Sequence, residues 1–152
     1  PPLRSREDVE ALREGLKNDI MDVISTDHAP HGSAEKNRTM KMAPFGIVGL
    51  ETSAALTYTE LVEPGILTPM QMAEKMSYNP ARILGLAEKG SVSEGMIADV
   101  VIFDPSKEYI IRKETFVSKG KNTPFDGRKV KGDVNCTIVG GKIVYEGGKV
   151  ID

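Results

Sequence analysis

Near the start of the chain, Val9, Leu12 and Leu16 have the spacing of one helix face. This pattern predicts a helix over residues 5–17. Ser5 can cap its first turn, and Asp8 three positions later completes a pattern like a capping box. The same apolar period, together with starts that contain proline, predicts three more helices downstream. They cover residues 47–61, 68–76 and 79–85.

A short apolar run follows the first helix. Met21–Thr26 is too short for a helix and contains β-branched residues, which is typical of a buried strand. Pro30 and Gly32 then force a loop. The polar stretch Gly32–Ala43 is expected to be an exposed loop.

The pattern changes at about residues 86–90, where we place a domain boundary. Short alternating runs replace the helical period, so we expect the rest of the chain to be mostly β-structure. Gly140-Gly141 lies between two such runs and predicts a two-residue hairpin turn. The predicted strands are Ala98–Asp104, closed by Pro105, then Glu108–Arg112, Asn135–Val139 and Lys142–Tyr145.

Composition narrows the choice of fold and partner. The chain has 152 residues, whereas a complete (β/α)₈ barrel typically needs about 250. A formal net charge of -2 does not favour a nucleic-acid partner, and no apolar run reaches the roughly 18–20 residues of a membrane span. The single cysteine, Cys136, forms no internal disulfide and reads as a small buried hydrophobe in a strand.

The candidate chemistry lies in Ser25-Thr26-Asp27-His28-Ala29-Pro30-His31. A carboxylate at the end of a buried strand, such as Asp27, is where α/β enzymes place reactive groups, and it can bind a cation or act as an acid or base. His31 can bind a metal or an anionic substrate. The plainer alternatives are that Asp27 caps a turn and that His31 is a solvated loop residue.

These residues resemble a known family. Thr26–His31 followed by Ala43–Thr52 is similar to the end of the barrel in bacterial class I dihydroorotases, members of the amidohydrolase superfamily. Weaker likenesses continue on both sides, in order along nearly the whole chain. They are Pro1–Ser5, Asn79-Pro80-Ala81, Gly95–Asp99 and Lys119–Phe125.

The resemblance implies an α/β fold in two parts. Residues 1–87 would form the C-terminal part of a TIM-like (β/α)₈ barrel, carrying its last strand and the active-site Asp27. Residues 88–152 would form the β-rich C-terminal part of a small β-sandwich domain. The chain begins at Pro1 without an initiator methionine, and we expect a fragment, a cleaved product or a chain whose earlier part is missing.

The resemblance also implies site roles in a zinc-dependent enzyme of pyrimidine biosynthesis, one that interconverts N-carbamoyl-L-aspartate and L-dihydroorotate. Asp27 would be a metal ligand and the catalytic acid and base, and His31 would bind the substrate carboxylate. Phe45 and Gly46 would contact the substrate ring, largely through backbone groups. His28 is given no catalytic role and is expected to be structural.

Most of the metal ligands that the resemblance implies are missing from this sequence. The family's other metal ligands include a His-x-His pair, and this sequence has none, so one or two Zn²⁺ ions would need ligands from outside the chain. We therefore expect the chain alone to be inactive. We expect a cytoplasmic protein that binds a small-molecule substrate, no nucleic acid and no membrane, and that forms a homodimer or associates with the missing N-terminal part.

Three alternatives remain open at this stage. The enzyme could be a hydantoinase, dihydropyrimidinase or allantoinase, which share the strand-end carboxylate; His31 favours an anionic substrate instead. The chain could also belong to a non-catalytic dihydroorotase-like scaffold subunit. Finally, Gly32–Ala43 is either a lid over the substrate or a solvated loop with Lys36, Arg38 and Lys41 as ordinary surface charges.

Overall fold

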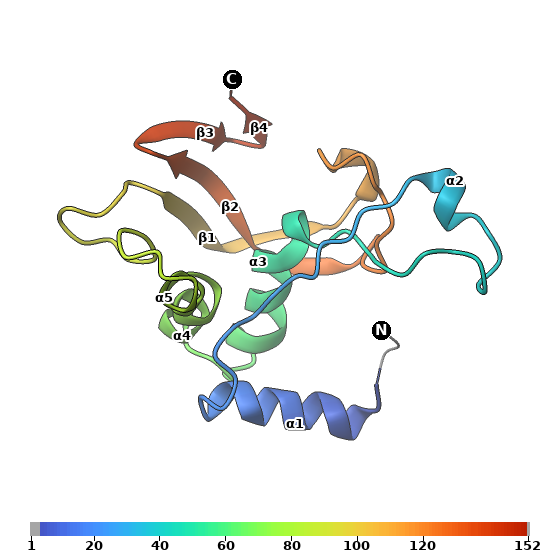
Figure 1. The fold of residues 1–152 in the computed structure, drawn as a ribbon, viewed down its shortest axis with the longest axis horizontal. Coiled ribbons are helices and arrows are strands. Elements are labelled where there is room, and N and C mark those ends of the chain that lie inside the picture. The colour runs from blue at the N-terminus through green and yellow to red at the C-terminus, as the bar shows by residue number, and fades with distance from the viewer. Residues whose placement is uncertain (1–3, 152) are drawn as a thin grey trace.

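A computed structural model describes residues 4–151, so the Pro1-Pro2-Leu3 opening lies outside the described residues. Helices fill the first half of this range, and a four-stranded antiparallel sheet fills the second (Figure 1). The helices are α1 (Arg6–Lys17), α2 (Ser33–Lys36), η1 (Leu50–Thr52), α3 (Ser53–Thr57), η2 (Tyr58–Val62), α4 (Pro69–Ala73), η3 (Glu74–Tyr78), α5 (Asn79–Ile83) and η4 (Lys113–Thr115). The strands are β1 (Val100–Ile110), β2 (Lys129–Val139), β3 (Lys142–Glu146) and β4 (Lys149–Val150).

Helix α1 begins where the sequence predicts. The Ser5 hydroxyl accepts a hydrogen bond from the Asp8 amide at 3.3 Å, and the Asp8 carboxylate accepts one from the Ser5 amide at 3.1 Å. This reciprocal pair is a capping box, which satisfies amides that the first turn would otherwise leave without partners. The predicted helix start is therefore confirmed.

The two helices predicted over 68–76 and 79–85 are wrong as separate elements. They form one helical run, α4–η3–α5, that begins after a capping box on Thr68 and passes straight through Asn79-Pro80. The turn before the proline is widened: η3 is π-helical, and the Asn79 amide donates to the Glu74 carbonyl. This wider turn accommodates Pro80, which has no amide to donate and whose ring crowds the preceding turn of an ordinary α-helix.

The predicted strand over Met21–Thr26 is also not formed. The segment is extended but pairs with no neighbour among the described residues, and Val23 and Ile24 are only half-buried. One isolated parallel bridge, between His28 and Ile47, lies just beyond it. A parallel strand needs hydrogen-bonded neighbours, and the described part of the chain supplies only this single bridge.

The sheet confirms the predicted hairpin. Strands β2 and β3 pair up to Val139 and Lys142 around Gly140-Gly141, whose positive φ angles of 55° and 79° match the tight turn that favours glycine. Pro105, in contrast, does not end a strand. Strand β1 continues through it, and the pairing with β2 shifts register there, so the proline occupies an irregularity where no ladder hydrogen bond is needed.

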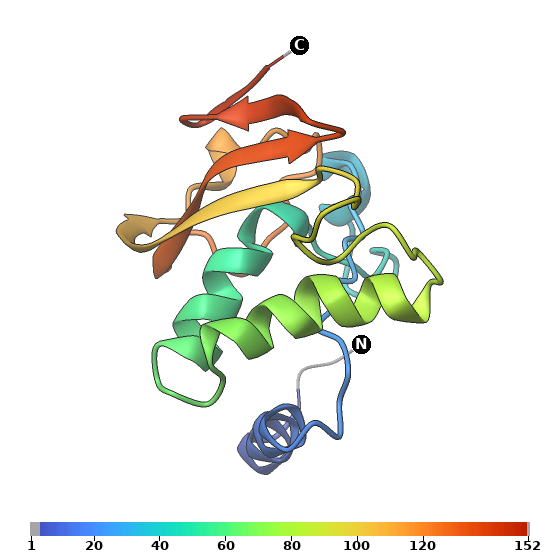
Figure 2. The ribbon, with the colours of Figure 1, turned by 90° about the vertical axis from the view of Figure 1, so that its left-hand side faces the viewer.

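Helices α1 and α3 and the run α4–η3–α5 lie on one side of the sheet (Figure 2). Helix α3 packs against β2, the run α4–α5 crosses beside it, and α1 lies furthest from the sheet (Figure 2). One buried cluster joins α1 to the helices and contains Leu16, Val62 and Leu67. A second joins α3 to the sheet and contains Ala55, Ile111 and Val130. No helix within residues 4–151 is both long and apolar enough to cross a membrane.

Small loop elements depart from expectation. Gly32–Ala43 is largely exposed, as predicted, but contains the short helix α2. A second double-glycine turn, Gly147-Gly148, adds strand β4 to the sheet edge, which the sequence analysis missed. Cys136 is buried in β2, as expected.

Candidate functional site

Asp27 has an unusual backbone. Its φ angle is 44°, and among the described residues only Asp19 shares a positive φ without being glycine. Side chains with a Cβ rarely adopt this region, although aspartate is enriched there. The Asp27 side chain is exposed at the point where the extended segment turns into the 28–31 loop. Such strained positions persist only where the surroundings hold them, and they concentrate at functional sites.

His28 links this turn to the next segment along the chain. Its Nδ1 atom accepts hydrogen bonds from the amides of Gly49 at 3.0 Å and Leu50 at 3.4 Å. The ring therefore caps the start of the 50–62 helical run. This contact gives His28 a structural part; the expectation that it has no catalytic role stays a prediction.

The predicted site segments lie side by side. The Ala29 amide donates to the Ile47 carbonyl at 2.9 Å, next to the bridge between His28 and Ile47. Gly46 has a φ of 122°, and a Cβ there would lie 2.6 Å from the Ala29 Cβ and 2.8 Å from its carbonyl oxygen. The close approach of these two backbones therefore requires glycine at position 46.

Two side chains that the sequence analysis did not select hold the second segment in place. Lys36 Nζ donates to the carbonyls of Pro44 at 2.8 Å and Gly46 at 3.0 Å. Asn122 Nδ2 donates to the same Gly46 carbonyl at 2.9 Å. Lys36 is thus not an ordinary surface charge; it closes the 32–46 loop on either side of Phe45, a residue that is itself 84% exposed.

Asn122 belongs to the late Lys119–Phe125 stretch, one of the weaker likenesses to the family. Its carbonyl also accepts the Val48 amide at 2.9 Å. A Cβ on Gly120 would lie 2.9 Å from Pro30, so this segment packs against the 27–31 loop as well. Three stretches far apart in sequence, 27–31, 44–48 and 120–122, therefore meet at one place.

His31 lies over the first turn of α2. Its Nδ1 atom is 3.7 Å from the Glu35 carboxylate, and 29% of its side chain is exposed. The same carboxylate oxygen accepts the Gly32 amide at 3.0 Å, which fixes Glu35 in front of the ring. One helical turn therefore carries both the carboxylate that faces His31 and the lysine that binds the Pro44 and Gly46 carbonyls.

The donors of residues 4–151 do not make a metal site. Within the described range, no three His, Cys, Asp or Glu side chains come together as a metal site would require. Protein zinc sites take three or four such ligands. Asp27 supplies one, so the residues present do not by themselves fit the zinc ion that the resemblance implies.

Comparison with known proteins decides the family. The sequence pattern of the amidohydrolase family matches residues 2–144, nearly the whole chain. The chain belongs to the amidohydrolase family. The resemblance drawn from the Asp27–His31 and Ala43–Thr52 motifs is thereby confirmed at the level of the family.

Curated relatives of this amidohydrolase chain include two dihydroorotases of known source. That of Thermoanaerobacter sp. (strain X514) is 52% identical over 146 residues, which cover 96% of this chain and 33% of the relative. That of Bacillus subtilis (strain 168) is 49% identical over 151 residues, covering 99% of this chain and 35% of the relative. The chain therefore spans about a third of the length of the curated relatives it matches.

Solved structures give the same picture of the fold. An L-hydantoinase (dihydropyrimidinase) from Arthrobacter aurescens superposes with a TM-score of 0.94 at 35% identity, over 100% of this chain and 35% of that one. A dihydropyrimidinase from Brevibacillus agri NCHU1002 gives a TM-score of 0.93 at 29% identity, over 99% of this chain and 34% of that one. The amidohydrolase chain thus has the mixed helix and sheet structure of the corresponding third of these enzymes.

Proposed function

We propose that these residues form part of a dihydroorotase, which interconverts N-carbamoyl-L-aspartate and L-dihydroorotate in pyrimidine biosynthesis. The observation that carries the proposal is the meeting of the 27–31 and 44–48 segments, held by the Ala29–Ile47 hydrogen bond. Identities of about half to curated dihydroorotases over nearly the whole chain support it. The activity belongs to the complete protein that carries these residues.

Asp27 is assigned the proton transfers. Its exposed carboxylate accepts a proton at one oxygen from the attacking water and returns it to the departing amide nitrogen. In the reverse direction the same oxygen takes the proton from the amide nitrogen that closes the ring. The left-handed backbone at Asp27 would hold the carboxylate at the reacting bond and not alongside the segment that precedes it.

His31, Phe45 and Gly46 are assigned to substrate binding. An imidazole can hold the ring carboxylate of dihydroorotate, which distinguishes this substrate from neutral cyclic amides. The Gly46 carbonyl already accepts two hydrogen bonds, from Lys36 and Asn122. Its two lone pairs are therefore in use, and we assign the ring contact to the peptide amides of this segment, which can donate to a ring carbonyl.

The proposal requires the rest of the protein to supply most of the zinc ligands. Asp27 would supply one ligand, and the others would come from outside the described residues. When bound, such an ion activates water and polarises a carbonyl. No step here is derived through it.

The architecture belongs to the same proposal. Residues 1–87 would form the C-terminal part of a (β/α)₈ barrel and residues 88–152 part of a small β-rich domain, with the remaining strands supplied by the N-terminal part; the protein would form a homodimer or associate with that part. We propose a cytoplasmic protein that acts on a small molecule. The Met21–Thr26 segment supports the barrel assignment. It is extended without strand partners among the described residues, and a barrel's last strand needs a neighbour on each side.

The test replaces the proposed acid and base in the complete natural protein. Asp27→Ala should lower kcat for dihydroorotate hydrolysis by about 10²–10⁴-fold, the usual contribution of general acid–base catalysis. Glu94→Ala, which removes an exposed carboxylate elsewhere, serves as the control and should leave kcat unchanged. Normal hydrolysis by the Asp27→Ala protein would show that the assigned mechanism is wrong.

A second candidate is a hydantoinase or dihydropyrimidinase, and the similarity to the Arthrobacter aurescens structure favours it. The discriminating residue is His31. If the substrate is dihydroorotate, His31→Ala should raise its KM and leave the weak turnover of a neutral dihydropyrimidine unchanged. Equal turnover of both compounds by the unsubstituted protein would favour the second candidate, and turnover of neither would favour a non-catalytic scaffold.

A further inference from the structure

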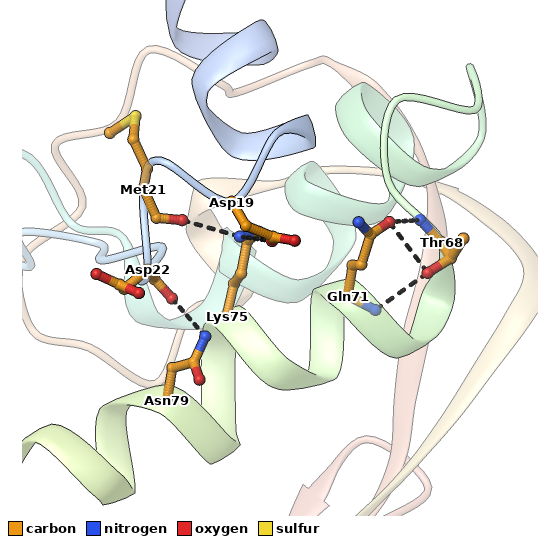
Figure 3. Close-up of polar contacts among 7 residues, drawn as sticks. All are labelled: Asp19, Met21, Asp22, Thr68, Gln71, Lys75 and Asn79. Atoms are coloured by element: carbon orange, nitrogen blue, oxygen red, sulfur yellow. Dashed lines mark hydrogen bonds and ion pairs between the residues drawn. The ribbon is translucent and has the colours of Figure 1, made fainter.

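Lys75 is a buried lysine outside the candidate site. The residue is 1% exposed, and it lies on the π-helical turn η3. Its ammonium donates to the Asp19 carboxylate and to the Met21 carbonyl, both at 2.8 Å (Figure 3). Burying a charge is unfavourable unless it is paired and hydrogen-bonded, so these two contacts are what allow a lysine here.

The same helical run makes two more contacts with the segment that leads to Asp27. The Lys75 carbonyl accepts the Ile24 amide at 3.0 Å. Asn79 Nδ2 donates to the Asp22 carbonyl at 3.0 Å (Figure 3). Within the described residues, these bonds add to those that the Asp19, Ile20 and Met21 amides make with the Leu16 and Gly15 carbonyls at the end of α1.

Asp19 combines a left-handed backbone with the carboxylate that pairs with Lys75. It follows the last turn of α1 with a φ of 56°, and the Ile20 amide donates to the Gly15 carbonyl at 2.9 Å. Helices that end in this way favour glycine at the left-handed position. Aspartate adopts that conformation less readily, but it supplies the carboxylate that pairs with Lys75.

We propose that Lys75, through the Asp19 carboxylate and the Met21 carbonyl, is a positioning residue for Asp27. It fixes the path of the chain between the end of α1 and the reactive turn, with left-handed aspartates at both ends of that path. A methionine would fill the same space without the cost of burying a charge, so the lysine contributes position more than stability. This role rests on the function proposed for Asp27.

The experiment compares Lys75→Met with Lys17→Met in the complete natural protein. Lys17 is the control, because it is exposed on α1 next to the same segment. In the Lys75→Met protein, amide hydrogen exchange over residues 20–27 should quicken by about tenfold or more while β2 keeps its protection. The kcat for dihydroorotate should fall by about ten- to a hundredfold with KM within about twofold, because misplacing a catalytic group affects the chemical step.

Two variants of Asp19 keep the test decisive if Lys75→Met does not fold. Asp19→Gly suits the left-handed backbone but removes the carboxylate, so it should reproduce the faster exchange and lower kcat. Asp19→Asn retains an oxygen that accepts from Lys75. Its exchange rate over residues 20–27 and its kcat should both stay within about threefold of those of the unsubstituted protein. A purely structural role would not separate glycine from asparagine in this order.

Several results would overturn the assignment. Unchanged exchange over 20–27 in the Asp19→Gly protein would do so, as would a rise in KM with kcat unaffected. Exchange that quickens equally in β2 would mean that Lys75 stabilises the whole fold instead of positioning one segment. If the unsubstituted protein does not hydrolyse dihydroorotate, the proposed function fails, and the exchange measurements alone then decide whether Lys75 fixes this path.

Discussion

Gly46→Ala is the sharpest perturbation of the candidate site. The new Cβ would lie 2.6 Å from the Ala29 Cβ and 2.8 Å from the Ala29 carbonyl oxygen, distances that require the backbone to move. Ala29 lies between Asp27 and His31. Alanine at position 46 should therefore separate the two site segments and displace residues on both sides of Ala29.

The loss in free energy of unfolding expected for Gly46→Ala has two contributions. A left-handed backbone at a residue other than glycine costs about 1–3 kcal/mol, and overpacking adds about 1–3 kcal/mol. Gly65→Ala isolates the first contribution, since Gly65 has a φ of 78° but open space around the added Cβ. In the complete natural protein, Gly46→Ala should therefore lose about 1–3 kcal/mol more of its free energy of unfolding than Gly65→Ala, and its Tm should be lower.

Thermal unfolding and dihydroorotate hydrolysis are the assays. Gly65→Ala should keep its kcat/KM, whereas Gly46→Ala should lose about tenfold or more, because small displacements of catalytic groups are costly. Adding Ala29→Gly to Gly46→Ala removes the Cβ–Cβ contact and should recover part of the Tm. If Gly46→Ala and Gly65→Ala behave alike in both assays, the close approach does not hold the site together.

Three further predictions concern single side chains. Lys36→Met should raise the KM for dihydroorotate by about tenfold, the loss expected for a charged hydrogen bond, while Lys41→Met on the same loop should not change it; equal effects would make Lys36 a general surface charge. Ser5→Ala should destabilise the protein to urea by about 1 kcal/mol through loss of the helix cap, and an unchanged midpoint would contradict the capping box. Burial raises the pKa of Tyr109 from 10.0 to about 12, so the stability that its neutral hydroxyl contributes below pH 10 should be lost as the pH rises towards 12. A Tyr109→Phe protein should show a flatter decline over that window, and parallel curves would argue against the shift.

Features encoded within a few residues were predictable from sequence. The Ser5–Asp8 capping box and the Gly140-Gly141 hairpin each depend on side chains or backbone angles three or fewer positions apart. Their signals are therefore complete in the local sequence. Asp27 and His31 were selected by the same kind of local reading, since they follow a short apolar run directly.

Features that depend on distant partners were not predictable. The sequence predicts a new helix start at Asn79-Pro80 and a strand end at Pro105, but a π-helical turn accommodates the first proline and a register shift accommodates the second. Met21–Thr26 has the composition of a strand, yet composition does not supply the neighbour that a strand needs. In each case the backbone around the residue, and not the residue itself, determined the outcome.

The two lysines show why the contacts that support the candidate site leave no signal in the sequence. Lys36 and Lys75 look like solvated charges in sequence, yet each donates to main-chain carbonyls next to a candidate site segment. A lysine ammonium has three donors and can join carbonyls from separate turns of chain. Because any residue offers a carbonyl, such a contact leaves no motif. The groups assigned to the reaction must be particular residue types, whereas the backbone atoms that hold them in place need not be.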